Sequence, residues 1–137
     1  LGAYLAVSGK FAIMPMLFSF LVITWVSGFE ILYSLQDEVF DKSENLKSIP
    51  VVAGTKNALV LSLAIHLCSI FFITLIGIIG KFGVFYTMGA ILFSGLLLYQ
   101  HTLLKHNDLS KINLAFFTLN GIASLVFGFF TIVSFYL

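Results

Sequence analysis

The sequence contains no arginine and very little charge of any kind. Charged residues make up 9% of its 137 residues, whereas soluble domains carry about 25%. A chain that is 60% hydrophobic with so few charges cannot cover a water-facing surface, so we classify it as an integral membrane protein. The net charge of +1 and the lack of arginine, the usual bidentate phosphate binder, give no electrostatic basis for binding nucleic acid.

Cysteine is almost absent as well. Cys68 is the single cysteine and lies in an apolar stretch. One thiol excludes an internal disulfide and a cysteine cluster for a metal, and it gives no indication of redox compartment.

Four long stretches of the sequence contain no charged residue. They are residues 11–29, 57–80, 82–104 and 112–137, with lengths of 19, 24, 23 and 26 residues. Each is long enough to cross a bilayer as a helix, which needs about 20 residues. Helices are favoured because the backbone must satisfy its own hydrogen bonds in lipid, and the alternation typical of barrel strands is missing. We therefore predict an all-α, polytopic bundle of four spanning helices.

Most of the remaining charge is concentrated in one connection. Eight of the thirteen charged residues lie between Glu30 and Lys56, and five of the six acids lie between Glu30 and Glu44. Because charge is costly beside membrane helices, this clustering suggests a polar site at their mouth. Glu30 lies inside the end of the first apolar stretch, where an acid is either functional or extends to the membrane interface.

The distribution of lysine predicts an orientation. The connections at residues 35–56 and 100–111 share one face of the bundle, because successive helices alternate in direction. Five lysines lie on that face and two on the other. Lysine marks the cytoplasmic side, so we predict a multi-pass protein of the inner (cytoplasmic) membrane of a bacterium, with its charged loops in the cytoplasm.

The charged connection is expected to contain a short helix at the membrane surface. Ser48 fits the N-cap of this helix, and Pro50 fits its first turn. Gly54 can end the helix before the next apolar stretch begins.

Tyr33, Asp37 and Asp41 follow one another at intervals of four residues. If the first spanning helix continues past its apolar stretch, they form one stripe, which Glu30 joins. Two carboxylates one turn apart suit Mg²⁺, which commonly takes one or two protein carboxylates together with phosphate oxygens of a substrate. Lys47 can add positive charge for such phosphates. The simpler alternative is a solvated helix end whose charges only stop the membrane segment.

Other polar residues carry weaker signals. His66 and Asn120 lie within apolar stretches, where a contact between helices is the favoured interpretation. His101, His106 and Asp108 share the connection at residues 100–111. Their spacing does not form a convincing metal set, and we expect a loop that closes over the site.

The segment YSLQDEVFDKSENLKSIPVVAG, residues 33–54, resembles the second aspartate-rich motif of the UbiA superfamily of membrane aromatic prenyltransferases. The resemblance is closest to the 4-hydroxybenzoate polyprenyltransferase branch, and WVSGFEILY and KHNDLSKINLAFFTLNG resemble the same branch. It implies nine transmembrane helices around a central cavity. It also implies two aspartate-rich motifs that bind Mg²⁺ and the diphosphate of a polyprenyl donor, whose prenyl cation alkylates an aromatic ring.

The resemblance also assigns roles to individual residues. Asp37 and Asp41 correspond to metal ligands of the second motif, and Tyr33 to the aromatic hydroxyl that precedes them. Lys47 resembles the basic residue that meets the diphosphate. Lys42 stands where an arginine often follows the second aspartate, and it is a second candidate for binding substrate.

The first aspartate-rich motif of that family, of the form NDxxDxxxD, does not occur in the sequence. We therefore expect residues 1–137 to be the C-terminal part of a single prenyltransferase domain that is inactive on its own. The expected function is transfer of a polyprenyl group to an acceptor such as 4-hydroxybenzoate, in ubiquinone or menaquinone biosynthesis. A small transporter or ion-path subunit is the alternative, although the middle of the last three apolar stretches holds no acid. A purely structural membrane anchor would leave the clustered acids unexplained.

Overall fold

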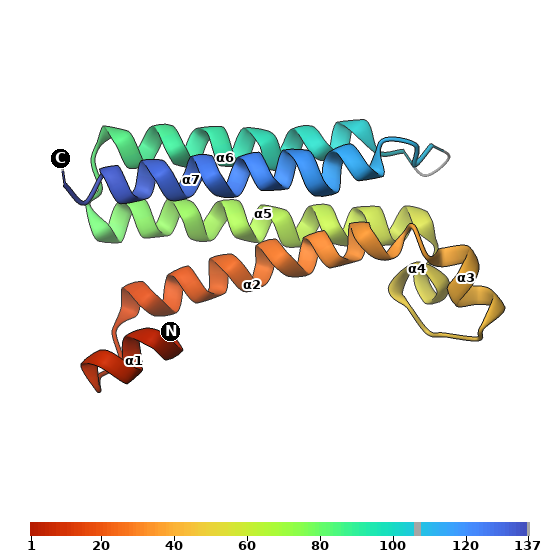
Figure 1. The fold of residues 1–137 in the computed structure, drawn as a ribbon, viewed down its shortest axis with the longest axis horizontal. Helices are drawn as coiled ribbons and strands as arrows, with labels where there is room; N and C mark the ends of the chain where they lie inside the picture. Colours follow the sequence, from red (N-terminus) through yellow and green to blue (C-terminus); the bar gives the residue numbers. More distant parts are fainter. Residues whose placement is uncertain (106–107, 137) are drawn as a thin grey trace.

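The computed structural model describes residues 1–105 and 108–136, most of which are helical (Figure 1). The helices are α1 (Gly2–Ser8), α2 (Ile13–Ser34), α3 (Glu38–Ser43), α4 (Ile49–Ala53), α5 (Thr55–Gly80), α6 (Val84–Leu103), the π-helix η1 (Leu114–Leu119) and α7 (Asn120–Val133). The long helices run side by side along one axis. The predicted all-α bundle is therefore confirmed.

Three helices, α2, α5 and α6, are long and apolar enough to span a membrane in the part of the chain that the structure describes. They correspond to the first three predicted stretches. The fourth stretch forms η1 and α7, and its apolar helix, Phe117–Val133, is shorter than a full span. A fourth spanning helix therefore stays a prediction, although α7 lies beside α6 along the bundle (Figure 1).

The connections gather at the ends of the bundle as expected. Figure 1 shows α3, α4 and the connection between α6 and η1 at one end, which we call the charged end. The turn between α5 and α6 lies at the opposite end, which is also the end at which α1 lies. At the charged end, the Gln36 side-chain amide donates a hydrogen bond of 2.9 Å to Asn113 Oδ1, which joins two connections far apart in sequence.

The predicted short helix after the charged connection forms as α4. Ser48 is its N-cap residue, Pro50 lies in its first turn, and Gly54 follows it with a φ of 83° that favours glycine. The Ser48 hydroxyl does not cap the helix, however. It is buried and has no hydrogen-bond partner among the described residues.

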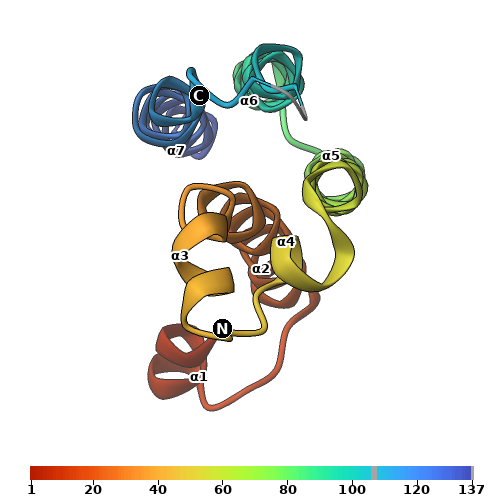
Figure 2. The ribbon, with the colours of Figure 1, turned by 90° about the vertical axis from the view of Figure 1, so that its right-hand side faces the viewer.

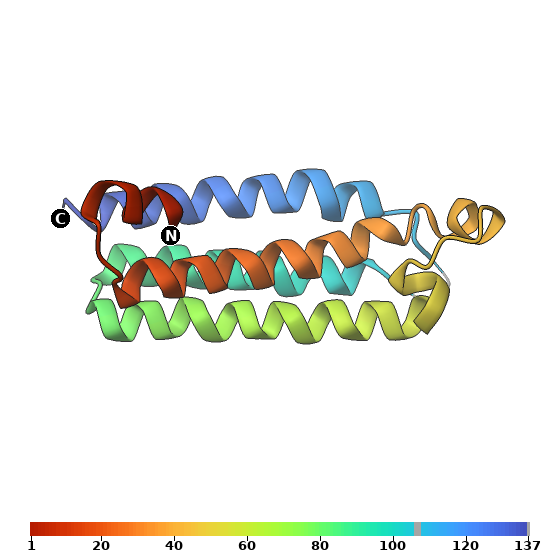
Figure 3. The same cartoon turned by 90° about the horizontal axis from the view of Figure 1, so that it is seen from below.

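Helices α2 and α5 form the closest helix pair (Figure 3). Small and hydroxyl-bearing residues line their contact, where Ser62 Oγ donates to the Gly28 carbonyl at 2.6 Å and Ser69 Oγ donates to Thr24 Oγ1 at 2.9 Å. Small residues let two helix backbones approach in a membrane, and their hydroxyls then bond across the interface. The paired helices provide the scaffold on which the charged end is built.

A polar cluster at His66 joins three helices. The His66 ring on α5 is fully buried, with Nε2 3.2 Å from the Trp25 carbonyl of α2. Its Nδ1 lies 2.8 Å from His101 Nε2 and 3.1 Å from Gln100 Nε2, both on α6. Because a carbonyl only accepts, His66 must donate through Nε2, so its Nδ1 accepts and His101 Nε2 donates. The predicted helix-contact role of His66 is confirmed.

Asn120 behaves differently from the prediction made for it. Asn120 is the first residue of α7, and its Oδ1 is buried without a hydrogen-bond partner among the described residues. That oxygen therefore does not make the expected bond between helices.

An apolar core fills the rest of the bundle between α2, α5, α6 and α7. Its most buried members are Leu21, Ile73, Ile76, Tyr86, Phe93, Leu97 and Ala123. The Trp25 ring packs edge-on against Phe93 at a centroid distance of 5.2 Å. This contact joins α2 to α6 within the core. Dispersion and close packing hold these helices together, since lipid chains are as apolar as the side chains they replace.

Gly28→Ala should destabilise the bundle. A Cβ at Gly28 would overlap the His66 ring, which cannot move easily because both of its nitrogens are hydrogen-bonded. We expect a loss of about 1–3 kcal/mol, as for other overpacked sites, measured by thermal unfolding in detergent. The control is Gly95→Ala, where a Cβ meets nothing within 4 Å. Equal melting temperatures for the two variants would contradict this packing.

Candidate functional site at the charged end

The first spanning helix ends before the aspartates. α2 stops at Ser34, a turn follows, and α3 begins at Glu38. Leu35 N–H bonds to the Leu32 carbonyl, and Gln36 N–H to the Tyr33 carbonyl, so the last turn tightens instead of continuing. The predicted single stripe is therefore wrong, because Tyr33 lies on the last turn of α2 and the aspartates lie beyond the break.

Asp37 and Asp41 nevertheless stay one helical turn apart. Asp37 is the N-cap residue of α3, and the Asp41 N–H donates to the Asp37 carbonyl at 2.7 Å. Asp37 is exposed and Asp41 is half-buried. Neither carboxylate has a hydrogen bond or ion pair with another side chain in residues 1–105 and 108–136. Both are therefore available to a ligand.

The donor chemistry of this pair fits a hard divalent cation. Mg²⁺ prefers carboxylate oxygens, keeps several waters, and binds through one or two carboxylates together with substrate phosphates. No group of three or more histidine, cysteine, aspartate or glutamate side chains is arranged for a metal among the residues that the structure describes. Asp37 and Asp41 can therefore supply two ligand side chains, and the other positions must come from elsewhere.

Glu38, between the two aspartates, is fully engaged. Lys42 Nζ donates to its Oε1 at 2.6 Å, and the Thr55 hydroxyl donates to its Oε2 at 2.7 Å. Lys42, which was expected to bind substrate, is thus paired within α3. A glutamate four residues before a lysine is a favourable helical pair, so the sequence held a signal for this contact. No comparable local pattern indicated the contact with Thr55, which lies 17 residues away.

The other two predicted residues flank this helix. Lys47 is exposed in the connection between α3 and α4, and Tyr33 is half-buried at the end of α2. The four predicted residues therefore lie on successive segments of the charged end, from the last turn of α2 to the connection before α4. Figure 2 shows α3 in front of the end of α2.

A groove of about 550 Å³ runs beneath this end, between α2, α4 and α5. Glu30, Ser27 and Ser34 line it from α2, and Leu61 and Ile65 line it from α5. Glu30 is exposed there, one turn from the end of α2. An acid that faces a cavity within a membrane segment is a candidate functional residue.

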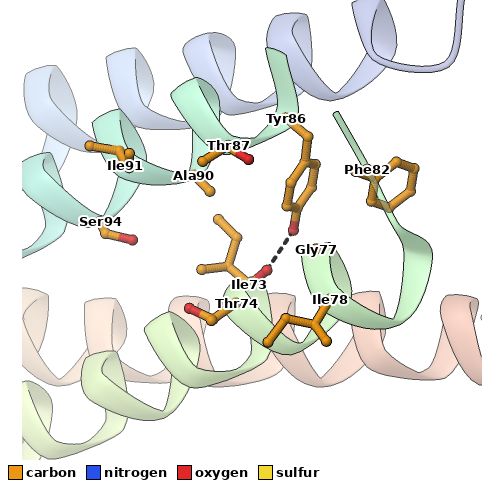
Figure 4. A pocket seen from close by; sticks show the side chains of 10 residues that line it. All are labelled: Ile73, Thr74, Gly77, Ile78, Phe82, Tyr86, Thr87, Ala90, Ile91 and Ser94. Carbon is orange, nitrogen blue, oxygen red and sulfur yellow. Dashed lines mark hydrogen bonds between the residues drawn. The ribbon is translucent and has the colours of Figure 1, made fainter. Parts of the chain in front are cut away.

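A second pocket, of about 540 Å³, lies between α5 and α6 toward the opposite end of the bundle (Figure 4). Its lining is mostly apolar, and the Tyr86 hydroxyl donates across it to the Ile73 carbonyl at 2.7 Å. No acid or lysine lines this pocket, so it offers no ligand for a metal or a phosphate.

The structure describes two of the three polar residues singled out in the connection at residues 100–111, and the expected closing loop stays a prediction. His101 belongs to α6 and bonds to His66, and His106 lies outside the described residues. Asp108 accepts a 3.0 Å hydrogen bond from the Ser110 N–H. Hydrogen bonding from the Ser110 side chain and backbone lowers the pKa of Asp108 below its ordinary value. Asp108 is therefore used in a local turn.

Comparison with known proteins identifies the family that these features belong to. The sequence profile of the UbiA prenyltransferase family matches residues 1–122. The chain belongs to the UbiA prenyltransferase family. The resemblance drawn from the charged segment is thereby confirmed.

A curated relative of this chain is longer than the chain itself. A 4-hydroxybenzoate octaprenyltransferase from Tolumonas auensis is 26% identical over 126 residues, which cover 92% of this chain and 44% of that protein. The chain thus spans less than half the length of this relative. No solved structure matches this chain.

The docking of α3 should depend on pH through Glu38. Hydrogen bonds from Lys42 and then Thr55 lower the pKa of Glu38 below its ordinary value of 4.5. Because folding lowers this pKa, the ionised Glu38 carboxylate stabilises the folded state. This stabilisation is complete above pH 4.5 and is lost as the pH falls through the lower pKa of the folded state. We expect amide hydrogen exchange in α3, corrected for intrinsic rates, to accelerate in that range. Unchanged protection of α3 there, or the same acid response in Glu38→Gln, would contradict this role.

Proposed function

We propose that the protein containing this chain transfers a polyprenyl group from polyprenyl diphosphate to an aromatic acceptor such as 4-hydroxybenzoate, in the synthesis of ubiquinone or menaquinone. The observation that carries the proposal is that the carboxylates of Asp37 and Asp41 lie one turn apart at the start of α3 and have no partner side chain among the described residues. They lie at the mouth of an apolar bundle. Membership of the UbiA family and the similarity to a 4-hydroxybenzoate octaprenyltransferase support the same chemistry.

In this proposal Asp37 and Asp41 hold Mg²⁺, and the exposed Lys47 ammonium contacts the diphosphate. Mg²⁺ held by these carboxylates would supply positive charge to the diphosphate oxygens of the leaving group. Lys42 can bind the same group only when it leaves Glu38. Tyr33 supports the site from the last turn of α2. The remaining ligands come from the part of the protein outside this chain.

The reaction needs a polar mouth and a dry interior. The bond between the prenyl C1 and the diphosphate oxygen breaks, and its electron pair leaves with the diphosphate. The allylic cation then forms a bond to a ring carbon of the acceptor, and the ring loses a proton. Positive charge fixed at the mouth stabilises the leaving group, while the apolar helices below exclude water that would otherwise capture the cation. The groove that contains Glu30 opens between these two environments.

The alternative of a transporter or ion-path subunit has less support. An ion path requires polar or acidic groups deep in several spanning helices. α5 and α6 contain no acid, and Glu30 of α2 lies close to the charged end. The lysines at the charged end support the further proposal that this end faces the cytoplasm of a bacterial inner membrane.

Asp37→Asn and Asp41→Asn in the full-length protein should each lower prenyl transfer by at least about 100-fold, a loss typical of removing a main electrostatic contact to the developing charge. Transfer is measured with radiolabelled 4-hydroxybenzoate and a polyprenyl diphosphate at saturating Mg²⁺. Glu44→Gln is the matched control, since Glu44 is an exposed acid of the same segment that makes no ion pair with the described residues. Full activity in either aspartate variant would refute the assignment.

A further inference from the structure

Helix α3 and its N-cap residue carry the two candidate metal ligands, and few contacts fix the position of this helix. It contains six residues, none of which is buried. Isolated helices this short are unstable in water, because forming the first turn fixes several residues for one hydrogen bond. Val39 and Phe40 are 82% and 61% exposed, so apolar packing does not anchor the helix either. Something else must fix its orientation.

Glu38 supplies that anchor. Its side chain is 14% exposed, whereas that of its partner Lys42 is 57% exposed. Both carboxylate oxygens are used, one for Lys42 within α3 and the other for the Thr55 hydroxyl at the first residue of α5. The bond to Thr55 is a side-chain hydrogen bond that connects α3 to a spanning helix. A bond to an ionised carboxylate is among the stronger protein hydrogen bonds.

We propose that Glu38 and Thr55 form a tether that positions Asp37 and Asp41 relative to α5. Glu38 and Thr55 are then positioning residues of the Mg²⁺ site. This inference rests on the proposed function. Asp37 directly precedes Glu38 and Asp41 lies three residues after it, so a rotation of α3 about the tether moves both carboxylates together. Groups that orient metal ligands commonly change metal affinity or activity by about 10–100-fold when they are removed.

The tether also provides an ion-pair partner for the Lys42 ammonium. Lys42 directly follows Asp41 in sequence, and its ammonium is paired with Glu38. The tether assigns Glu38 to positioning and not to direct ligation, because each of its oxygens already accepts a hydrogen bond from another side chain. The tether and direct ligation by Glu38 therefore make opposite predictions for Thr55.

Thr55→Val tests the tether with little change of volume, because it removes only the donor. Thr55→Ser keeps the hydroxyl and is the matched control. The full-length protein in nanodiscs is titrated with Mn²⁺, and free Mn²⁺ is measured by electron paramagnetic resonance. Amide hydrogen exchange of α3 is followed without metal. We expect Thr55→Val to bind Mn²⁺ about 10-fold more weakly and to exchange faster in α3, while Thr55→Ser stays close to the unmodified protein.

Two results would overturn the tether. One is Thr55→Val with unchanged exchange in α3 and unchanged Mn²⁺ affinity. The other is Glu38→Gln losing Mn²⁺ binding while Thr55→Val keeps it, because that pattern makes Glu38 a ligand. These results are separable from failure of the proposed function. A protein that binds Mn²⁺ in a Thr55-dependent way but transfers no prenyl group would retain the tether and refute the reaction.

Discussion

The bilayer interior offers no partner for a charge, and the arrangement of the chain follows from that constraint. Three long helices contain a single acid, Glu30, and it lies near the charged end. Several polar groups within the bundle are paired across helices, as at His66 and at Ser62. The remaining acids and lysines must therefore collect in the connections, where water can reach them. A site for a charged diphosphate can form there, directly above an apolar interior.

Much of the fold could be predicted because the same constraint is visible in the sequence. The uncharged stretches mark α2, α5 and α6, and Pro50 with Gly54 marks α4. The end of α2 could not be read in the same way. Beyond the membrane a helix is no longer obligatory, and local turn bonds after Leu32 end it instead of a proline or glycine. The π-helix η1 contacts α6 and continues directly into α7, and no local sequence pattern predicted it.

The candidate site was predictable to a similar degree. The spacing of Asp37 and Asp41 survives because Asp37 caps α3 and Asp41 lies in its first turn, whereas Tyr33 is separated from them by the turn after α2. The partners of Glu38 and of His66 were harder to find. Thr55 and His101 are 17 and 35 residues away along the chain, and only the packing of α3, α5 and α6 brings them into contact. Spacing reveals contacts within one helix but not between helices.

The most direct measurement is ³¹P electron–nuclear double resonance on the full-length protein with Mn²⁺ and a non-reactive polyprenyl diphosphate analogue. If Asp37 and Asp41 hold the cation that binds the diphosphate, Mn²⁺–³¹P coupling is present in the unmodified protein. It is then absent when both residues are changed to asparagine. Equal affinity for the analogue with and without divalent ions would contradict the claim that these two carboxylates bind the donor through a metal.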